Sequence, residues 1–382
     1  MKSIPQFFRV VLFACLAAGA VGAASPPQAA RIRPLPKPIK TTPPKEWPDE
    51  QTRAKQKKDA EKRALFASST PVAFTLTGNF KAIQSDREPN STKTFPGTVE
   101  FQGEDGSSVK VGLAIRARGQ VRRSYDVCEF APIRLEFPKE GLKKTVFDDQ
   151  HILKLGTHCR NVKEFEQYPL REYAAYRIFN LLSPRSFRVR LARVTYFDTA
   201  ANKTLGTHNG LLIENDEDVA KRMEGRLITQ RELLALLDRD AFTLMTLFEY
   251  MIGNLDVSII TQHNAKFVQT PNRTVYPIPY DFDYSGLVDA SYALPPPGLG
   301  ITTVRDRVFR GPCRPVAELE RFFEAFRTIR PELAKLYDSI PEFDAGARKK
   351  ALSYLDQFYR TLDRPNEVKQ AFTVGCLKSG LM

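Results

Sequence analysis

Four polar side chains in a short, otherwise largely apolar and aromatic stretch are the strongest candidates for chemistry in this sequence. Asp256 and Asn264 lie eight residues apart, and Asp281 and Asp283 follow a second short apolar segment. Carboxylate and amide oxygens are hard ligands of the kind that Mg²⁺ combines with phosphate oxygens. Phosphoryl transfer needs one acidic residue to orient the attacking hydroxyl, and an Asn and an Asp to hold metal against the phosphates. The order Asp, Asn, Asp therefore predicts metal-dependent phosphoryl transfer.

The elements around these residues are predicted to bring them together. A long helical pattern of apolar residues ends at Gly253, and a loop with Asp256 and Asn264 follows it. Two short strands, "AKFVQ" and "VYPIPYD", then flank a turn at Pro271-Asn272, and Asp281 leaves the second strand. We expect the three side chains to meet around one cleft.

The rest of the chain divides into a β-rich part and a helical part. From Val72, short segments of alternating apolar and polar residues are separated by turn residues, which is typical of antiparallel strands. One helix is predicted over Pro169–Ser183, and two more strands follow it. After Glu214 the pattern becomes helical, and two amphipathic helices over Arg314–Phe372 break near Pro341.

These stretches resemble a known family. "IGNLDVSIITQHNAKFV" and "IPYDFDYSG", preceded by "LREYAAYRIFNLL" and "NGLLIENDEDVAKR", are similar to the CotH kinase-like family, named for a bacterial spore-coat protein. The resemblance covers roughly Val109 to Arg310. It implies an α+β, bilobal protein-kinase-like fold, with a β-rich N-lobe over 71–215 and a mainly helical C-lobe over 216–382. It also implies transfer of phosphate from ATP, with Mg²⁺ or Mn²⁺, to a hydroxyl of a protein or of the cell envelope.

The resemblance also implies roles for particular residues. Asp256 matches the catalytic aspartate, Asn264 the metal-binding asparagine, and Asp281 the metal-binding aspartate, with Asp283 as an alternative to Asp281. The nucleotide would be held by a basic turn, by a hinge residue and by a helix carboxylate that pairs with a lysine. These residues are Arg116, Arg118 and Gly119 in the turn, Glu214 at the hinge and Glu172 on the helix.

Two departures from the family pattern change these expectations. Asn264 follows Asp256 by eight residues, whereas ordinary kinases use five, so the loop must contain an insertion. The nucleotide-binding lysine is either replaced by Arg134 or supplied by Lys154, and an arginine fork is no direct substitute for a point charge. From the residues alone, Asp256 could also cap a turn, and the basic turn could be a solvated edge.

The amino-terminal part predicts export. Residues 1–23 have a basic leader, a short apolar run and small residues suited to cleavage, which together indicate a signal peptide. Residues 24–70 are predicted to comprise a Pro- and Lys-rich linker and a charged helix that is solvated or weakly docked. We expect a periplasmic or secreted protein. An uncleaved anchor or a lipid on Cys15 is the alternative, and no later segment is apolar enough to cross a membrane.

Cysteine usage agrees with export. Removal of the leader leaves Cys128, Cys159, Cys313 and Cys376, and an even number in an exported chain suggests two disulfides. Among the three possible pairings, we favour the sequence-local ones, Cys128 with Cys159 and Cys313 with Cys376, because each would tie one half of the chain. Four free thiols are the alternative.

Net charge leaves the partner open. The formal charge of +13 favours polyanions in general, such as a nucleotide, an anionic envelope surface or nucleic acid, and by itself selects none of them. We expect no sequence-specific binding of nucleic acid. A noncatalytic secreted binding protein and a metal-dependent hydrolase are the alternatives to a kinase-like enzyme. No G-x-S-x-G, H-E-x-x-H or C-x-x-C motif offers another chemistry.

Overall fold

The computed structural model describes residues 46–230 and 235–377, so the predicted signal peptide and most of the linker lie outside the described residues. Every described helix and strand belongs to one compact unit that begins at Trp47. Within the described ranges, no helix is both long enough and apolar enough to cross a bilayer.

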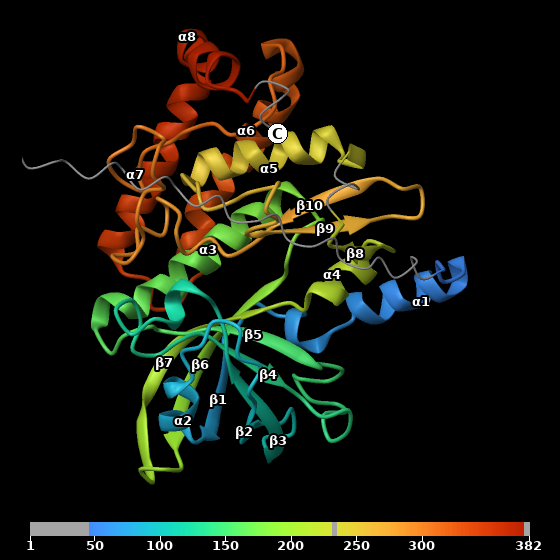
Figure 1. The fold of residues 1–382 in the computed structure, drawn as a ribbon, viewed down its shortest axis with the longest axis vertical. Helices are drawn as coiled ribbons and strands as arrows, with labels where there is room; N and C mark the ends of the chain where they lie inside the picture. The colour runs from blue at the N-terminus through green and yellow to red at the C-terminus, as the bar shows by residue number, and fades with distance from the viewer. Residues whose placement is uncertain (1–45, 231–234, 378–382) are drawn as a thin grey trace, which may run out of the picture. The chain divides into compact units, whose positions relative to one another are not determined.

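Seven strands form a closed barrel (Figure 1). Their order around it is β1-β2-β3-β4-β5-β7-β6, and all neighbours are antiparallel except β1 and β6, whose parallel pairing closes the barrel. The strands are β1 (Val72–Gly78), β2 (Phe95–Gln102), β3 (Ser108–Ala117), β4 (Ile133–Glu136), β5 (Ile152–Gly156), β6 (Val189–Asp198) and β7 (Lys203–Ile213). Alternate residues such as Leu135 and Leu153 are fully buried and fill the interior.

The expected bilobal protein-kinase-like fold, with a β-rich N-lobe and a mainly helical C-lobe, is wrong. The finding that overturns it is the closed barrel within a fold of mixed α and β content. Alternation in the sequence indicates that a segment is a strand but not which strand it pairs with. The parallel pairing of Val72 with Ala192 joins segments more than 100 residues apart, and no local pattern predicts it.

Helices and a second sheet complete the described fold. The three-stranded sheet has the order β10-β9-β8, with β8 (Arg226–Ile228), β9 (Ala265–Gln269) and β10 (Val275–Pro279). Helices α3 (Gln167–Leu182), α5 (Arg239–Ile252), α6 (Val316–Asp338) and α7 (Ala345–Leu362) share one apolar core. The shorter helices are α2 (Phe80–Ser85), α4 (Asp216–Arg222) and α8 (Pro365–Val368).

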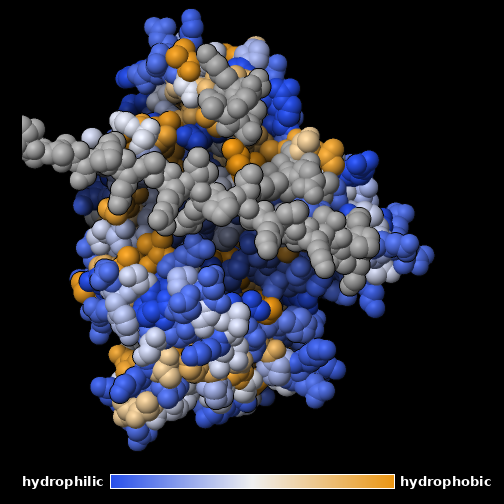
Figure 2. All heavy atoms as spheres, viewed as in Figure 1, coloured by the Kyte–Doolittle hydropathy of each residue, from blue (hydrophilic) through white to orange (hydrophobic). Residues whose placement is uncertain are grey.

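The charged helix near the amino terminus is α1 (Glu50–Glu61). Ala60 is its only buried residue, and hydrophilic residues cover its visible face (Figure 2). It is held mainly by polar contacts. Lys57 forms an ion pair with Glu224, while Arg188 donates hydrogen bonds to the carbonyls of Ala60 and Glu61. A helix without an apolar stripe can therefore dock where charges meet it.

Two expected helix boundaries are present. Helix α5 ends at Ile252, and Gly253 follows with a left-handed backbone (φ 65°), a conformation that glycine adopts at little cost. Its N–H donates to the carbonyl of Tyr250 and so satisfies one of the last carbonyls of α5. The amphipathic tail breaks between α6 and α7, and Asp344 caps the second helix by accepting from the N–H of Ala347.

Both predicted disulfides are confirmed. Cys128 is bonded to Cys159, and Cys313 is bonded to Cys376. The first bond lies in a small core with Phe165, beside the barrel strands, and the second ties the segment before α6 to the end of the described chain.

Candidate functional site

The loop after α5 holds Asp256 against Asn264. The side-chain Nδ2 of Asn264 donates to the carbonyl oxygen of Asp256 at 2.7 Å and to its Oδ2 at 2.9 Å. Between them, Ser258 and His263 exchange two backbone hydrogen bonds, so the intervening residues fold into a small closed loop. This loop accommodates the eight-residue spacing, because it projects the extra residues away while its ends stay together.

The hairpin β9-β10 places Asp281 beside Asn264. Ala265 pairs with Pro279, and just beyond this pair the N–H of Tyr280 donates to the carbonyl of Asn264 at 3.0 Å. Asn264 therefore enters the hairpin where Asp281 leaves it. The N–H of Asp281 donates to the Tyr176 hydroxyl at 2.9 Å. The structure thus brings Asp256, Asn264 and Asp281 together.

Two further acids, Glu172 and Asp283, add buried carboxyl groups to the site. Burial, together with the negative charges of Asp283 and Asp281, raises the pKa of Glu172 on α3 well above its ordinary value. Burial and the charge of Asp281 likewise raise the pKa of Asp283. The pKa of Asp256 is raised mainly by burial and by Asp281, although His263 opposes the shift. These directions require the four carboxyl groups to lie within electrostatic reach of one another.

Asp283 and Asp281 differ in how their carboxylates are used. Asp283 accepts a hydrogen bond from the Tyr292 hydroxyl at 3.1 Å and lies 3.6 Å from a guanidinium nitrogen of Arg122. Among the described residues, nothing donates a hydrogen bond to the carboxylate of Asp281 or forms an ion pair with it. Asp281 is therefore the freer ligand of the two.

Arg122 and Tyr292 were not singled out from the sequence. Arg122 is buried against Asp283, and it also donates to the carbonyl of Thr157 at 2.7 Å. It belongs to the same basic run as Arg116 and Arg118, although Arg116 lies in strand β3 and not in the expected turn. The partner of Arg122 lies 161 positions further along the chain. A basic run alone gives no signal for which of its arginines reaches a distant acid.

The candidate nucleotide-binding cations form a row across the outer face of the barrel. Arg116 pairs with Arg134 across β3 and β4, and Arg134 pairs with Lys154 across β4 and β5, so the three side chains share one face. Arg134 forms an ion pair with Glu136 at 2.8 Å. Arg118, just past the end of β3, lies close enough to lower the pKa of Lys154.

Lys154 has a different partner from the expected Glu172. Its ammonium group is paired with Asp216, which also lies 3.4 Å from the ammonium of Lys266. Burial lowers the pKa of Lys154 to about 8, and Asp216 partly offsets that shift. The amine also lies 4.9 Å from the ring centre of Tyr280, next to Asp281. Lys154 is therefore at the site, with its charge shared with Asp216.

Two other predicted site residues have different surroundings. The carboxylate of Glu214 is completely buried and accepts hydrogen bonds from both Arg188 and Arg222, so its side chain is saturated. Gly119 has a positive φ of 91°, and the space around its Cα is open. The turn at Gly119 leaves room for a ligand, whereas the side chain of Glu214 offers none.

The side chains of Asp281 and Asn264 suit a metal ion whose remaining ligands are water molecules and phosphate oxygens. In the described part of the chain, no group of three or more His, Cys, Asp or Glu side chains is arranged to hold a metal ion. Mg²⁺ commonly takes only one or two protein carboxylates and fills its other positions with water and phosphate oxygens. Asp281 with the amide oxygen of Asn264 fits that need, because the amide nitrogen of Asn264 is already turned toward Asp256.

The chain matches no known protein family and no curated protein. The resemblance to the CotH kinase-like family therefore stays a hypothesis, and the site must be interpreted from its own geometry.

Proposed function

We propose that this protein transfers a phosphoryl group from ATP, with Mg²⁺ or Mn²⁺, to a hydroxyl of a protein or of a cell-envelope molecule. The observation that supports this most directly is the meeting of Asp256, Asn264 and Asp281 at the open end of the β9-β10 hairpin. An acidic cluster adjoins them, and the basic residues Arg118 and Lys154 lie within reach.

Asp281 and Asn264 hold the metal in this proposal. When bound, the metal neutralises the phosphate charge that develops during transfer. Asp281 has a positive φ of 64°, and the Tyr176 hydroxyl fixes its backbone N–H. Phe282, which is fully buried against Tyr176 at 4.6 Å between ring centres, anchors the next residue. The Asp281 carboxylate, which has no hydrogen-bond or ion-pair partner among the described residues, is therefore on a firmly placed backbone.

Asp256 orients the acceptor hydroxyl and accepts its proton. Its side chain is 38% exposed, so a hydroxyl can reach it. His263 lies 3.2 Å from Oδ1 and Asn264 donates to Oδ2, which together fix the direction of the carboxylate. The raised pKa of Asp256 makes it a stronger base than an ordinary aspartate.

Lys154 and Arg118 supply positive charge for the phosphates. The pKa of Lys154, about 8, keeps most of its amine protonated at pH 7. Its ion pair with Asp216 competes with a phosphate, and this observation favours the second candidate, a noncatalytic binding protein that keeps the site without turnover.

The two candidates differ in metal-dependent nucleotide binding and transfer. We expect Mg²⁺ with ATP to raise the melting temperature of the protein, because a ligand at 100 times its Kd adds roughly 2.7 kcal/mol to the stability of the native state. Asp281→Asn should remove most of that rise. Asp256→Asn should keep the rise and abolish transfer, measured as phosphate incorporation from labelled ATP. Asp126→Asn, a change of the same kind at an exposed position, is the control.

Several outcomes would contradict the proposal. An unchanged melting temperature with either metal at millimolar ATP would remove it. Nucleotide binding without transfer to any hydroxyl would favour the noncatalytic alternative. Equal loss of binding in Asp256→Asn and Asp281→Asn would leave Asp256 as a turn residue only.

We also propose that the protein functions in the periplasm or as a secreted protein. Two disulfides persist best in an oxidising compartment, and the predicted signal peptide provides the export route. Amino-terminal sequencing of exported material tests this: cleavage near Ala23 is expected, and an intact Met1 would contradict it.

A further inference from the structure

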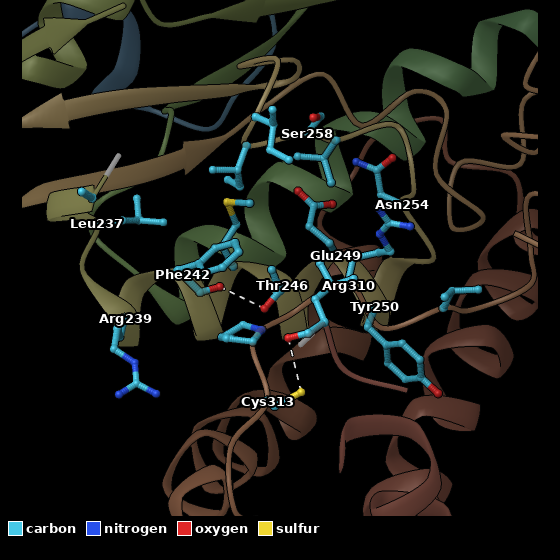
Figure 3. A pocket seen from close by; sticks show the side chains of 18 residues that line it. Leu237, Arg239, Phe242, Thr246, Glu249, Tyr250, Asn254, Ser258, Arg310 and Cys313 are labelled. Atoms are coloured by element: carbon cyan, nitrogen blue, oxygen red, sulfur yellow. Dashed lines mark hydrogen bonds between the residues drawn. The ribbon is translucent and has the colours of Figure 1, made fainter. Parts of the chain in front are cut away.

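A cavity of about 790 Å³ lies behind the loop that carries Asp256. Helix α5, the loop after it and residues 308–313 form its walls, as Figure 3 shows. The lining is mainly apolar, and it includes Phe242, Met245, Val257, Ile259 and Val308. We call this cavity the α5 pocket. Its size is in the range of pockets for small molecules, which extends from roughly 300 to 1,000 Å³.

A buried carboxylate lines this pocket and has no hydrogen-bond partner in the described part of the chain. Glu249 is only 3% exposed, and within the described residues neither of its oxygens accepts a hydrogen bond. Figure 3 shows the side chain directed toward the loop with Asn254 and Ser258. The Asn254 amide lies near enough to favour the charged form of Glu249, but its Nδ2 forms no hydrogen bond of acceptable geometry. A buried polar group without a partner is uncommon and costs free energy, so an external partner is expected.

The charges around Glu249 favour a cationic partner. Asp256 adds a second negative charge near the carboxylate. The cations among the lining residues, Arg239 and Arg310, are exposed, and among the described residues neither forms an ion pair with Glu249. The apolar wall therefore carries a carboxyl group that has no ion-pair partner among the described residues, and this group becomes negatively charged above its pKa of about 8. An apolar molecule with a positive head group fits this arrangement, because its charge would meet Glu249 and its body would meet the apolar wall.

We propose that the α5 pocket binds the phosphate acceptor, and that the acceptor has an apolar body with an ammonium group that pairs with Glu249. The acceptor role rests on the proposed function, since the loop with Asn254, Val257 and Ser258 lines the pocket and also carries Asp256. Asp256 itself does not line the pocket, so an acceptor anchored there must extend past this loop for its hydroxyl to reach the Asp256 carboxylate. The preference for an ammonium group follows from the pocket itself.

Three probes of similar size test the preference. They are 4-phenylbutylamine, 4-phenylbutan-1-ol and 4-phenylbutyrate, which carry a cation, a neutral hydroxyl and an anion on the same apolar body. Titration calorimetry at pH 9 keeps an alkylammonium group largely protonated, since lysine-like amines have a pKa of about 10.4. We expect the amine to bind at least about tenfold more tightly than the alcohol, which corresponds to about 1.4 kcal/mol. The butyrate should bind most weakly.

Glu249→Gln keeps the shape of the side chain and removes its charge, so it should abolish the preference for the amine. Glu104→Gln, at an exposed position, is the matched control and should leave the preference unchanged. Equal affinity of the wild-type protein for amine and alcohol would overturn the proposal without any variant. A preference that persists in Glu249→Gln would overturn it too.

The melting-temperature response to Mg²⁺ and ATP, measured on the same samples, separates this proposal from the proposed function. A nucleotide response without amine binding overturns the pocket assignment and leaves the phosphotransfer proposal standing. Amine binding without any nucleotide response overturns the acceptor role of the pocket.

Discussion

Glu214 and Glu249 are two glutamates that are almost equally hidden from water, at 0% and 3% exposed, yet their surroundings are opposite. Glu214 follows strand β7, and both of its oxygens accept hydrogen bonds from Arg188 and Arg222. Glu249 lies on α5 at the wall of a cavity, and neither of its oxygens accepts one within the described chain. The carboxylate of Glu214 has its hydrogen bonds filled within the fold. The carboxylate of Glu249 has no hydrogen-bond partner among the described residues and can accept hydrogen bonds from a ligand.

Burial of an acid is therefore no guide to its role until its partners are counted. The resemblance implies a nucleotide-binding role for Glu214, whereas the sequence pattern gives no signal that distinguishes Glu249 from the rest of its helix. Glu172 resembles Glu249 in that its buried Oε1 accepts no hydrogen bond among the described residues. Burial, Asp283 and Asp281 raise its pKa, whereas Arg122 and Arg118 oppose that shift. Acids that lack partners mark the regions where a ligand can act, because a structural acid has its hydrogen bonds filled.

Glu214→Ala tests the structural side of this comparison and should have the largest effect on stability. It leaves Arg188 and Arg222 without their carboxylate, and their side chains are only 22% and 12% exposed. Breaking a buried pair from one side costs about 3 to 5 kcal/mol. Urea unfolding should show this loss, while Glu104→Ala at an exposed position should change stability by less than about 0.5 kcal/mol. A loss below about 1 kcal/mol for Glu214→Ala would mean that the arginines find other partners.

Local features of the fold could be predicted from the sequence. The helix expected over Pro169–Ser183 is α3, which begins two residues earlier, at Gln167. The end of α5 was marked by Gly253, because a glycine after an apolar helical stripe can adopt the left-handed conformation that stops a helix. The disulfides followed from cysteine parity and short separation. The two helix features depend on neighbouring residues and the disulfides on the number and order of the cysteines, so all of them can be predicted from the sequence.

Features that depend on distant partners could not be predicted. The barrel closes through β1 and β6, whose pairing no local alternation indicates. The partner of Lys154 is Asp216, because β5 and the start of α4 meet only in the folded chain. The order of Asp256, Asn264 and Asp281 did suggest a shared site. The backbone hydrogen bonds between Ser258 and His263 that close the loop could not be predicted, because they depend on the folded backbone.

The two disulfides extend the comparison, because each supports a different region. Cys128–Cys159 lies in a small core with Tyr168 and Tyr292, next to the acidic cluster, whereas Cys313 lines the α5 pocket. Replacing either pair with serine should cost about 4 kcal/mol by the chain-entropy argument for loops of 31 and 63 residues, which can be measured by urea unfolding.

The two disulfide variants should differ in which ligand they bind less tightly. Without Cys128–Cys159 the response to Mg²⁺ and ATP should weaken more than amine binding, and without Cys313–Cys376 the order should be reversed. Measurements below the unfolding transition separate these effects from global unfolding. The same pattern in both variants would show that the two regions are one coupled site.

Glu249→Gln has the smallest expected effect on stability. The way this effect changes with pH tests whether the Glu249 carboxylate lacks a partner. Burial, with a smaller contribution from Asp256, raises the pKa of Glu249 from its ordinary 4.5 to about 8. Between these two values the folded protein binds more protons at this group than the unfolded chain does, so the wild-type protein loses stability as the pH rises through that window. Glutamine does not titrate, so the variant does not lose this stability.

The Glu249→Gln variant should therefore match the stability of the wild-type protein near pH 4 and exceed it by about 1 to 3 kcal/mol at pH 9, the usual cost of leaving a buried polar group unsatisfied. Comparing urea unfolding of the two proteins across this range cancels the titration of all other groups to first order. A difference that does not change with pH would mean that the carboxylate already has a partner, and the contrast with Glu214 would disappear.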